Sequence, residues 1–227
     1  FQAWVCSGFL MRCQRHRDAE RTVAASVSPP AGRTMRTAWN RETAAPSSAN
    51  QSFSMRTAAA RQASASPRRR EILGQLGVEF RIEPSGMDES MLPGEGPKTH
   101  VERLAREKGL QVRERLQDAA DRPCVLSADT VVLLDGIVYG KPVDDADALR
   151  MLRNLSGRTH QVLTGIALCE VRGAFSESLV LATEVTFRTL DEPTMRGYVA
   201  SGEARDKAGS YAIQGLGTGL VRGIQGS

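Results

Sequence analysis

Three short blocks of polar and charged residues contain the side chains that a polyphosphate-binding enzyme needs. They are Ser64 to Arg70 (SASPRRR), Ser127 to Val132 (SADTVV) and Asp206 to Gly215 (DKAGSYAIQG). The blocks supply hydroxyl groups at the start of a helix, paired guanidinium groups, a carboxylate in a strand and a lysine beside glycine-rich backbone. Helix N-termini and arginine side chains bind phosphate oxygens, and a carboxylate can activate a water molecule. Together the blocks predict an enzyme that acts on nucleotides.

Each of these features also has a simpler interpretation. Arg68 and Arg69 lie in the first turn of a predicted helix, where they could equally face solvent. Asp129 could lie at a strand end in water, although a carboxylate among β-branched residues is costly unless it is paired, metal-bound or catalytic. Lys141 precedes a proline that restricts its backbone, and Gln214 offers an amide that could read the edge of a base. Both are also ordinary turn residues, so the prediction depends on finding all these features in one chain.

The patterns along residues 66–200 predict an α/β fold, with a mixed β-sheet and flanking helices. Helical periodicity and capping residues predict helices from Pro67 to Gly77, from about Lys98, from Asp144 or Asp145 to Gly157, and near 191–200. Alternating or β-branched runs predict strands at 78–82, 124–134, 159–171 and 178–190. The pair Asp135-Gly136 predicts a hairpin turn into a short strand.

Residues 1–58 differ in composition from the rest of the chain, which we divide into this segment and a domain of residues 59–227. Residues 1–66 hold nine arginines and three acidic residues, so residues 67–227 carry a net charge of −2. Residues 1–58 lack apolar periodicity, and we expect a disordered segment, or a spurious extension if translation starts at Met55. We therefore expect neither nucleic acid nor a membrane as a partner of the domain. An alternative, which rests on charge alone, is that residues 1–58 bind one of them.

The remaining composition indicates a cytoplasmic protein. No apolar run approaches the ~20 residues that span a bilayer. The four cysteines show neither CxxC spacing nor the density of a disulfide framework.

Five stretches of the chain, in the right order, resemble the Maf family of nucleoside triphosphate pyrophosphatases: SASPRRREIL, SADTVV, YGKP, MLRNLSGRTHQVLTG and DKAGSYAIQG. The resemblance runs from about Ala63 to Ser227. It implies a mixed α/β fold like that of inosine triphosphatases, with two lobes around a nucleotide-binding cleft, and a homodimer. It also implies hydrolysis of a nucleoside triphosphate between its α and β phosphates, with a divalent metal cation, Mg²⁺ or Mn²⁺.

The resemblance assigns roles to residues of this sequence. Asp129 matches the proposed general base of the family and a metal ligand, and Glu89, in the polar loop 84–96, matches a second metal ligand. The residues at substrate-binding positions are Ser64, Arg68, Arg69, Lys108, Thr130, Lys141 and Gln214.

Three of these positions separate the subfamilies. Here they are Arg68, Thr130 and Gln214, a set that resembles the branch acting on dTTP and UTP, with modified pyrimidine nucleotides as further candidates. The branch acting on 7-methyl-GTP tends to have Trp, Gln and Glu there, so a preference for that or another purine nucleotide is the first alternative. The second alternative is a catalytically impaired, nucleotide-binding regulator of cell division.

Two features depart from the family pattern. The first strand is normally an apolar run, whereas here it reads Ala58 to Gln62 (AAARQ), and Arg61 and Gln62 are unfavourable inside a sheet. The family continues beyond the position of Ser227 with a Gly-Leu-Pro segment and a final helix. We expect the domain without that segment to be less stable.

Overall fold

The computed structural model describes residues 60–64, 66–121, 123–174 and 176–226. The predictions for residues 1–58 lie outside this part. The described elements, in chain order, are β1 (Ala60–Gln62), α2 (Pro67–Gln75), β2 (Phe80–Ile82), α3 (Pro97–Arg115), β3 (Cys124–Leu134), β4 (Ile137–Tyr139), α4 (Asp145–Leu155), β5 (Thr159–Glu170), β6 (Ser176–Phe187), α5 (Glu192–Ala200), the 3-10 turns η1 (Ala208–Ser210) and η2 (Gly215–Leu220), and β7 (Val221–Gly226).

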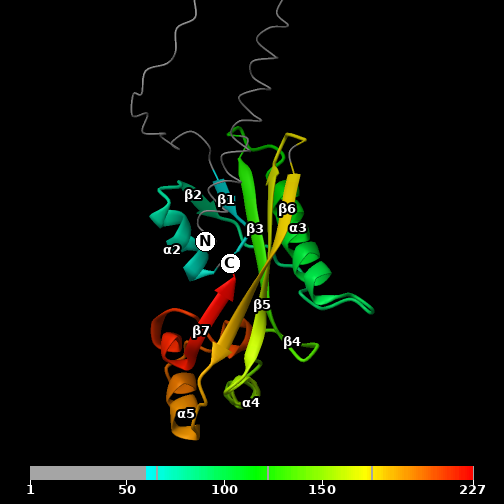
Figure 1. The fold of residues 1–227 in the computed structure, drawn as a ribbon. Helices are drawn as coiled ribbons and strands as arrows, with labels where there is room; N and C mark the ends of the chain where they lie inside the picture. Colours follow the sequence, from blue (N-terminus) through cyan, green and yellow to red (C-terminus); the bar gives the residue numbers. More distant parts are fainter. Residues whose placement is uncertain (1–59, 65, 122, 175, 227) are drawn as a thin grey trace, which may run out of the picture.

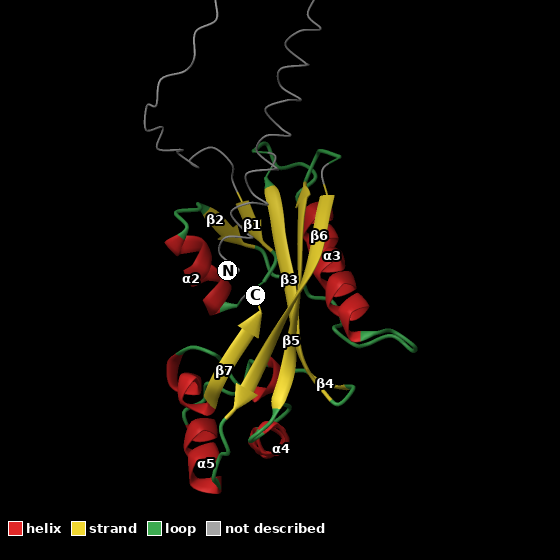
Figure 2. Cartoon of the chain, in the orientation of Figure 1, coloured by secondary structure: helices red, strands yellow, loops and turns green. Residues whose placement is uncertain are grey.

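The strands of the described part form one mixed sheet (Figure 2). Six of its seven strands run in the order β2-β1-β3-β5-β6-β7, and the seventh, β4, pairs with the end of β3. β1 is parallel to both β2 and β3, whereas the other pairs are antiparallel. The long strands β3, β5 and β6 run through the middle of the molecule (Figure 1). The predicted α/β fold with a mixed sheet and flanking helices is confirmed, while the division into two lobes stays a prediction.

Turn and capping residues explain where several elements begin and end. Asp135 and Gly136 join β3 to β4 with φ angles of 50° and 79°, which suit the predicted hairpin turn. Asp144 begins α4 because its carboxylate accepts a hydrogen bond from the Asp147 amide at 2.7 Å. Gly77, with a φ angle of 66°, follows the end of α2. These boundaries agree closely with the predicted ones.

β1 forms despite its unfavourable sequence, because a parallel strand pairs with it on each side. Arg61 and Gln62 are only 5% and 1% exposed. Arg61 makes an ion pair with Asp121 at 2.6 Å. Neither amide atom of Gln62 has a hydrogen-bond partner within the described residues. The strand therefore contains a buried, unpaired amide where an apolar side chain would be expected.

α3 covers one face of the sheet and packs on β3 and β5 (Figure 1). Its buried residues recur at helical spacing: His100, Val101, Leu104, Ala105, Lys108, Gly109 and Val112. At Gly165 of β5 the two backbones approach closely, since an added Cβ would lie 2.1 Å from the Val101 carbonyl oxygen. The Ser127 hydroxyl of β3 donates a hydrogen bond to the Ala105 carbonyl at 2.6 Å. These contacts hold α3 against the strand that carries Asp129.

α3 is also the longest described helix, at 19 residues, and charged side chains occur along its length. No helix in the described ranges is long and apolar enough to cross a membrane.

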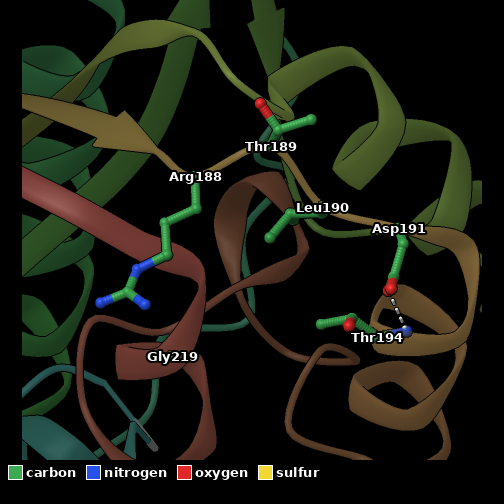
Figure 3. Close-up of a pocket in the computed structure, with 6 residues that line it drawn as sticks. All are labelled: Arg188, Thr189, Leu190, Asp191, Thr194 and Gly219. Carbon is green, nitrogen blue, oxygen red and sulfur yellow. Dashed lines mark hydrogen bonds between the residues drawn. The ribbon is translucent and has the colours of Figure 1, made fainter.

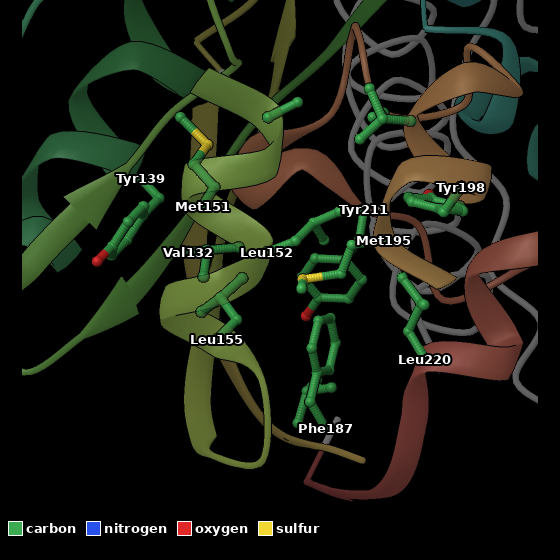
Figure 4. Close-up of a cluster of buried hydrophobic side chains, with 14 of the residues drawn as sticks. Val132, Tyr139, Met151, Leu152, Leu155, Phe187, Met195, Tyr198, Tyr211 and Leu220 are labelled. Atoms are coloured by element: carbon green, nitrogen blue, oxygen red, sulfur yellow. The ribbon is translucent and has the colours of Figure 1, made fainter. Parts of the chain in front are cut away.

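The opposite face of the sheet carries two separate hydrophobic clusters. In the first, Leu73 of α2 packs with Leu126 and Ala128 of β3. In the second, Val132 of the same strand packs with side chains of α4, α5 and the C-terminal segment (Figure 4). Because the side chains of a strand alternate between its faces, Ala128, Thr130 and Val132 share this face. Thr130 therefore lies at a polar break between the two clusters.

Candidate active site

The candidate site lies along an edge of β3 that has no neighbouring strand. Pairing with β1 stops at Leu126, and pairing with β4 begins at Val132. Between these residues, on the side away from β5, β3 has no strand partner in the described part of the chain. Asp129 and Thr130 lie in this interval, just beyond the carboxyl end of β1. In α/β sheets, ligands commonly bind beyond the carboxyl ends of parallel strands.

Arg69 connects the start of α2 to this edge. Its Nη1 donates hydrogen bonds to the Ser64 hydroxyl at 2.9 Å and to the Ala128 carbonyl at 2.8 Å. Its Nη2 lies 3.4 Å from the Thr130 hydroxyl, which is 3.1 Å from the hydroxyl of Thr164 on β5. The Ser64 hydroxyl also accepts a hydrogen bond from the amide of Ser66, the residue before α2, at 3.2 Å. The guanidinium therefore lies near the start of the helix, where backbone N–H groups favour anions. Three predicted substrate-binding residues thus lie together.

Lys108 joins two carboxylates on the α3 face of β3. Its ammonium group donates to Asp129 Oδ1 at 2.6 Å and to Glu89 Oε1 at 2.7 Å. The side chains of Lys108 and Asp129 are 7% and 10% exposed, whereas that of Glu89 is 44% exposed. Lys141 Nζ lies 3.1 Å from the second oxygen of Glu89. The four residues form a chain of alternating charge that leads from a buried aspartate to an exposed lysine.

The environment of Glu89 keeps its pKa below the ordinary value of 4.5. Partial burial by itself would raise this pKa, but hydrogen bonds and charge attraction from Lys108 and Lys141 outweigh it. Glu89 is therefore ionised at neutral pH, as a cation ligand must be.

The segment 206–214 packs against the chain that leads to Lys141. The Gly209 amide donates a hydrogen bond to the Gly140 carbonyl at 2.9 Å. Gly209 has a φ angle of 67°, and an added Cβ would lie 2.7 Å from Cγ2 of Val132, so the position requires glycine. Lys207 makes an ion pair with its neighbour Asp206.

Two predicted substrate-binding residues, Arg68 and Gln214, are not joined to this network by hydrogen bonds between described residues. Gln214 is exposed and immediately precedes η2. Burial raises the pKa of Tyr198 on α5, and the nearby positive charge of Arg68 opposes that rise. Tyr198 accepts a hydrogen bond from the Ala212 amide at 3.1 Å. Arg68 thus lies within electrostatic reach of Tyr198, whose hydroxyl contacts the segment that leads to Gln214.

Sequence reasoning missed Thr164 and Glu203, which support the predicted residues. Thr164 meets the Thr130 hydroxyl because the two residues are paired across β3 and β5. Glu203 accepts hydrogen bonds from the amides of Leu216 and Gly217, at 3.0 and 3.3 Å, and so holds η2 in place. Strand register and turn contacts of this kind leave no local signal in a single sequence.

The divalent metal cation implied by the family resemblance fits the donor set. Asp129 and Glu89 each place an oxygen within 2.7 Å of the same lysine nitrogen. Mg²⁺ is commonly held by one or two carboxylates together with substrate phosphates and water. Among the described residues, no group of three or more His, Cys, Asp or Glu side chains could hold a metal. Water, and substrate phosphates once a nucleotide is bound, would complete the coordination of the cation.

A separate pocket of about 390 Å³ lies between the end of β6 and the start of α5 (Figure 3). It is lined by Arg188, Thr189, Leu190, Asp191, Thr194 and Gly219. The Asp191 carboxylate accepts a hydrogen bond from the Thr194 amide at 2.9 Å, so a side chain already caps this helix. None of the predicted site residues lines the pocket.

Comparisons with known proteins extend over the part of the chain that carries this network. Residues 62–227 match the family model described as Maf-like protein. The dTTP/UTP pyrophosphatase of Escherichia coli O157:H7 is 51% identical over 165 residues, which cover 73% of this chain and 81% of that protein. The dTTP/UTP pyrophosphatase of Anaeromyxobacter dehalogenans (strain 2CP-C) is 48% identical over 73% of this chain and 82% of its own length. That of Syntrophomonas wolfei is 44% identical, over 72% and 85%.

The family match starts at the residue where β1 ends and includes all the predicted site residues. Sequence identity of this extent over most of both chains confirms the resemblance inferred from the motifs. The chain belongs to the Maf family.

Proposed function

We propose that the protein hydrolyses dTTP and UTP to the nucleoside monophosphate and pyrophosphate. The observation that carries the proposal is the hydrogen-bonded chain from Asp129 through Lys108 and Glu89 to Lys141, at the open edge of β3. The relatives that are 44–51% identical to this chain are named dTTP/UTP pyrophosphatases, which supports the choice of substrates. We also propose that the activity lies in the cytoplasm.

The phosphate chain would bind between the start of α2 and the end of the β3–β4 hairpin. Arg69 offers a planar group with several N–H donors, already oriented by the Ser64 hydroxyl and the Ala128 carbonyl. The side chain of Lys141 is 58% exposed, so its ammonium group is accessible to phosphates that enter from solvent. These residues would neutralise charge that develops on the leaving pyrophosphate.

Asp129 is the residue of this network best suited to activate water. Its carboxylate is nearly buried and is held by Lys108 at 2.6 Å, so its orientation is fixed before substrate binds. The carboxylate would accept a proton from the water that attacks the α phosphorus. The bond from that phosphorus to the bridging oxygen then breaks, and pyrophosphate leaves with the electron pair.

A divalent cation would be held by Glu89 and Asp129, with Mg²⁺ and Mn²⁺ as the candidates. When bound, such a cation supplies charge neutralisation at the phosphate oxygens. The two carboxylate oxygens that meet at Lys108 Nζ support this assignment.

The preference for pyrimidines rests on Arg68, Thr130 and Gln214. The Thr130 hydroxyl is fixed by Arg69 and Thr164, so it presents a defined donor or acceptor at the polar break between the two hydrophobic clusters. The exposed amide of Gln214 can hydrogen-bond the edge of a base. A site built on such polar groups discriminates against bases that leave them unpaired.

Pyrophosphate release from dTTP, UTP, CTP, GTP and 7-methyl-GTP tests the proposal, each with Mg²⁺, with Mn²⁺ and with a chelator. We expect release from dTTP and UTP that requires a cation, and much slower release from the other three. Faster release from 7-methyl-GTP or GTP would favour the purine alternative. No release from any nucleotide, by protein with an intact circular dichroism spectrum, would overturn the assignment as an enzyme.

A further inference from the structure

The loop between β2 and α3 carries Glu89 but has little hydrophobic anchoring of its own. Residues 88–94 are all exposed, including Met91 at 39% and Leu92 at 52%. Apolar burial therefore contributes little to fixing this part of the loop. A carboxylate that must meet Lys108 and a cation at a defined place needs other contacts to hold its backbone.

Those contacts converge on Glu95, at the end of the loop. Its side chain is 5% exposed and accepts hydrogen bonds from Arg103 Nε at 2.7 Å and Arg103 Nη2 at 2.9 Å. It also accepts one from the Leu92 amide at 3.1 Å and lies 3.0 Å from His100 Nδ1. A paired, two-pronged contact of this kind between arginine and carboxylate is strong and fixed in direction.

Arg103 reaches past Glu95 to the backbone beside Glu89. Its Nη2 donates to the Ser90 carbonyl at 3.1 Å, one residue after Glu89. The Ser90 amide and hydroxyl both donate to the Asp88 carboxylate, at 3.0 and 2.7 Å, which closes a tight local turn around Glu89. The guanidinium group therefore binds the loop through the side chain of Glu95 and through the backbone carbonyl of Ser90.

Arg103 and Lys108 belong to the same helix, about one and a half turns apart. The helix is docked on the sheet at Gly165 and Ser127, so it acts as a rigid support. We propose that Arg103, with Glu95 as its partner, is a positioning residue that holds Glu89 within reach of Lys108 and of the divalent cation. The role of the cation rests on the proposed function, whereas the grip of Arg103 on the loop does not.

The charges of the pair support this role. Hydrogen bonds from Arg103 lower the pKa of Glu95 to about 2, although burial opposes them. Hydrogen bonds to Glu95 raise the pKa of Arg103 in turn. Both groups therefore stay charged at every pH at which the enzyme would work.

Other residues of α3 also touch the loop, but farther from Glu89. Arg115 donates to the Pro84 carbonyl at 2.6 Å, and Gln111 accepts from the Gly86 amide at 3.1 Å. These contacts hold the beginning of the loop. The part of the loop that follows Glu89 is instead contacted by Arg103.

The test compares Arg103→Gln with a matched control, Glu107→Gln. Glu107 is the other carboxylate bound to Arg103, at 2.9 Å, and its loss leaves the contacts to Glu95 and Ser90 in place. Because Arg103→Gln leaves the buried Glu95 charge without its main partner, a double variant with Glu95→Gln is included. The double variant removes both charges and keeps the test valid if the single variant folds poorly.

Two measurements decide the outcome. In hydrogen exchange of the protein without cation or nucleotide, we expect the hydrogen-bonded amides of Ser90 and Leu92 to exchange at least tenfold faster in Arg103→Gln and in the double variant, and unchanged in Glu107→Gln. In titrations with Mn²⁺ alone, followed by electron paramagnetic resonance, we expect at least tenfold weaker binding in the same two variants. Loop exchange equal to wild type in both would overturn the proposal.

The Mg²⁺ dependence of the turnover rate distinguishes a failure of the positioning role of Arg103 from a failure of the proposed function. We expect the Mg²⁺ concentration for half-maximal rate to rise about tenfold in Arg103→Gln, with a maximal rate at saturating Mg²⁺ within about threefold of wild type. A fall in maximal rate with unchanged Mg²⁺ dependence would contradict a positioning role. If wild type neither binds Mn²⁺ nor releases pyrophosphate, the proposed function fails, while the exchange result still decides whether Arg103 holds the loop.

Discussion

At the scale of residues, the site depends on cationic side chains that each bind several groups at once. Arg69 contacts the hydroxyl of Ser64, before α2, and both a carbonyl and a hydroxyl of β3. Lys108 contacts two carboxylates, one buried and one exposed. Because each such group orients its neighbours, a single substitution at the site is expected to act on more than one of them.

Asp129→Asn tests the proposed base. Asparagine keeps the shape of the side chain but cannot accept a proton, so we expect turnover of dTTP to fall by at least ~10²-fold. The circular dichroism spectrum should stay close to that of wild type. The control is Asp135→Asn, an exposed turn residue whose φ angle of 50° asparagine tolerates. Wild-type turnover in Asp129→Asn would refute the assigned role.

Gln62→Leu tests the cost of the unpaired amide in β1. The side chain is 1% exposed, and neither amide atom has a partner among the described residues. Replacing a buried unpaired amide by an apolar group of similar size should raise the free energy of unfolding by about 1–3 kcal/mol. Urea unfolding measures it, with the exposed Gln75→Leu as a control that should change little. A less stable Gln62→Leu would show that the amide is satisfied after all.

At the scale of elements, α3 is the support on which most of the site is built. It supplies Lys108 directly and holds the loop of Glu89 through Arg103. Its position depends on close contact with β5 at Gly165, the residue paired with Asp129. The distance between Lys108 and Asp129 is thus set by backbone packing several residues away.

Gly165→Ala tests this dependence. An added Cβ would lie 2.1 Å from the Val101 carbonyl oxygen, and since that atom belongs to the backbone, the whole helix must move. We expect a loss of about 1–3 kcal/mol of stability, and turnover reduced more than partial unfolding alone explains. The control is Gly74→Ala in α2, where nothing lies within 4 Å and alanine should stabilise the helix by about 0.5–1 kcal/mol. Full turnover in a folded Gly165→Ala protein would contradict the account.

At the scale of the whole molecule, a buried aromatic group connects the sheet to the C-terminal segment. His160 of β5 lies edge-on to Phe187 of β6 and to Tyr211, with ring centroids 5.0 and 5.4 Å apart. Its Nε2 is 2.7 Å from the Tyr211 hydroxyl. Tyr211 follows η1, so this group anchors the segment that packs beside the hairpin of Lys141.

This group predicts a loss of stability in mild acid. Burial lowers the pKa of His160 from 6.5 to about 4, so the folded state resists protonation that the unfolded state accepts. The contribution of neutral His160 to the free energy of unfolding is therefore fully present above pH 6.5. It falls as the pH drops from about 6.5 toward 4, by at most ~1.4 kcal/mol per pH unit. Unfolding measured from pH 7 to 5 should show a smaller loss in His160→Gln. Parallel curves for the two proteins would contradict the prediction.

Much of the architecture could be predicted because its signals are local. The turn at Asp135-Gly136, the cap at Asp144 and the helical face of α3 depend on residues within one turn of each other. The formation of β1 could not be judged in this way. Its sequence is poor for a strand, and pairing with β2 and β3 overrides that preference.

The amino-acid sequence alone determined the family, the order of the elements and the residues able to bind phosphate and a cation, because motif and periodicity are properties of the chain itself. The tertiary structure decided which of these residues meet. It brought Ser64, Arg69 and Thr130 together on one face of β3, and Glu89, Lys108 and Asp129 on the other. It also revealed the grip of Arg103 on the loop of Glu89. Strand register, helix docking and loop anchoring depend on contacts between distant parts of the chain, so no local pattern encodes them.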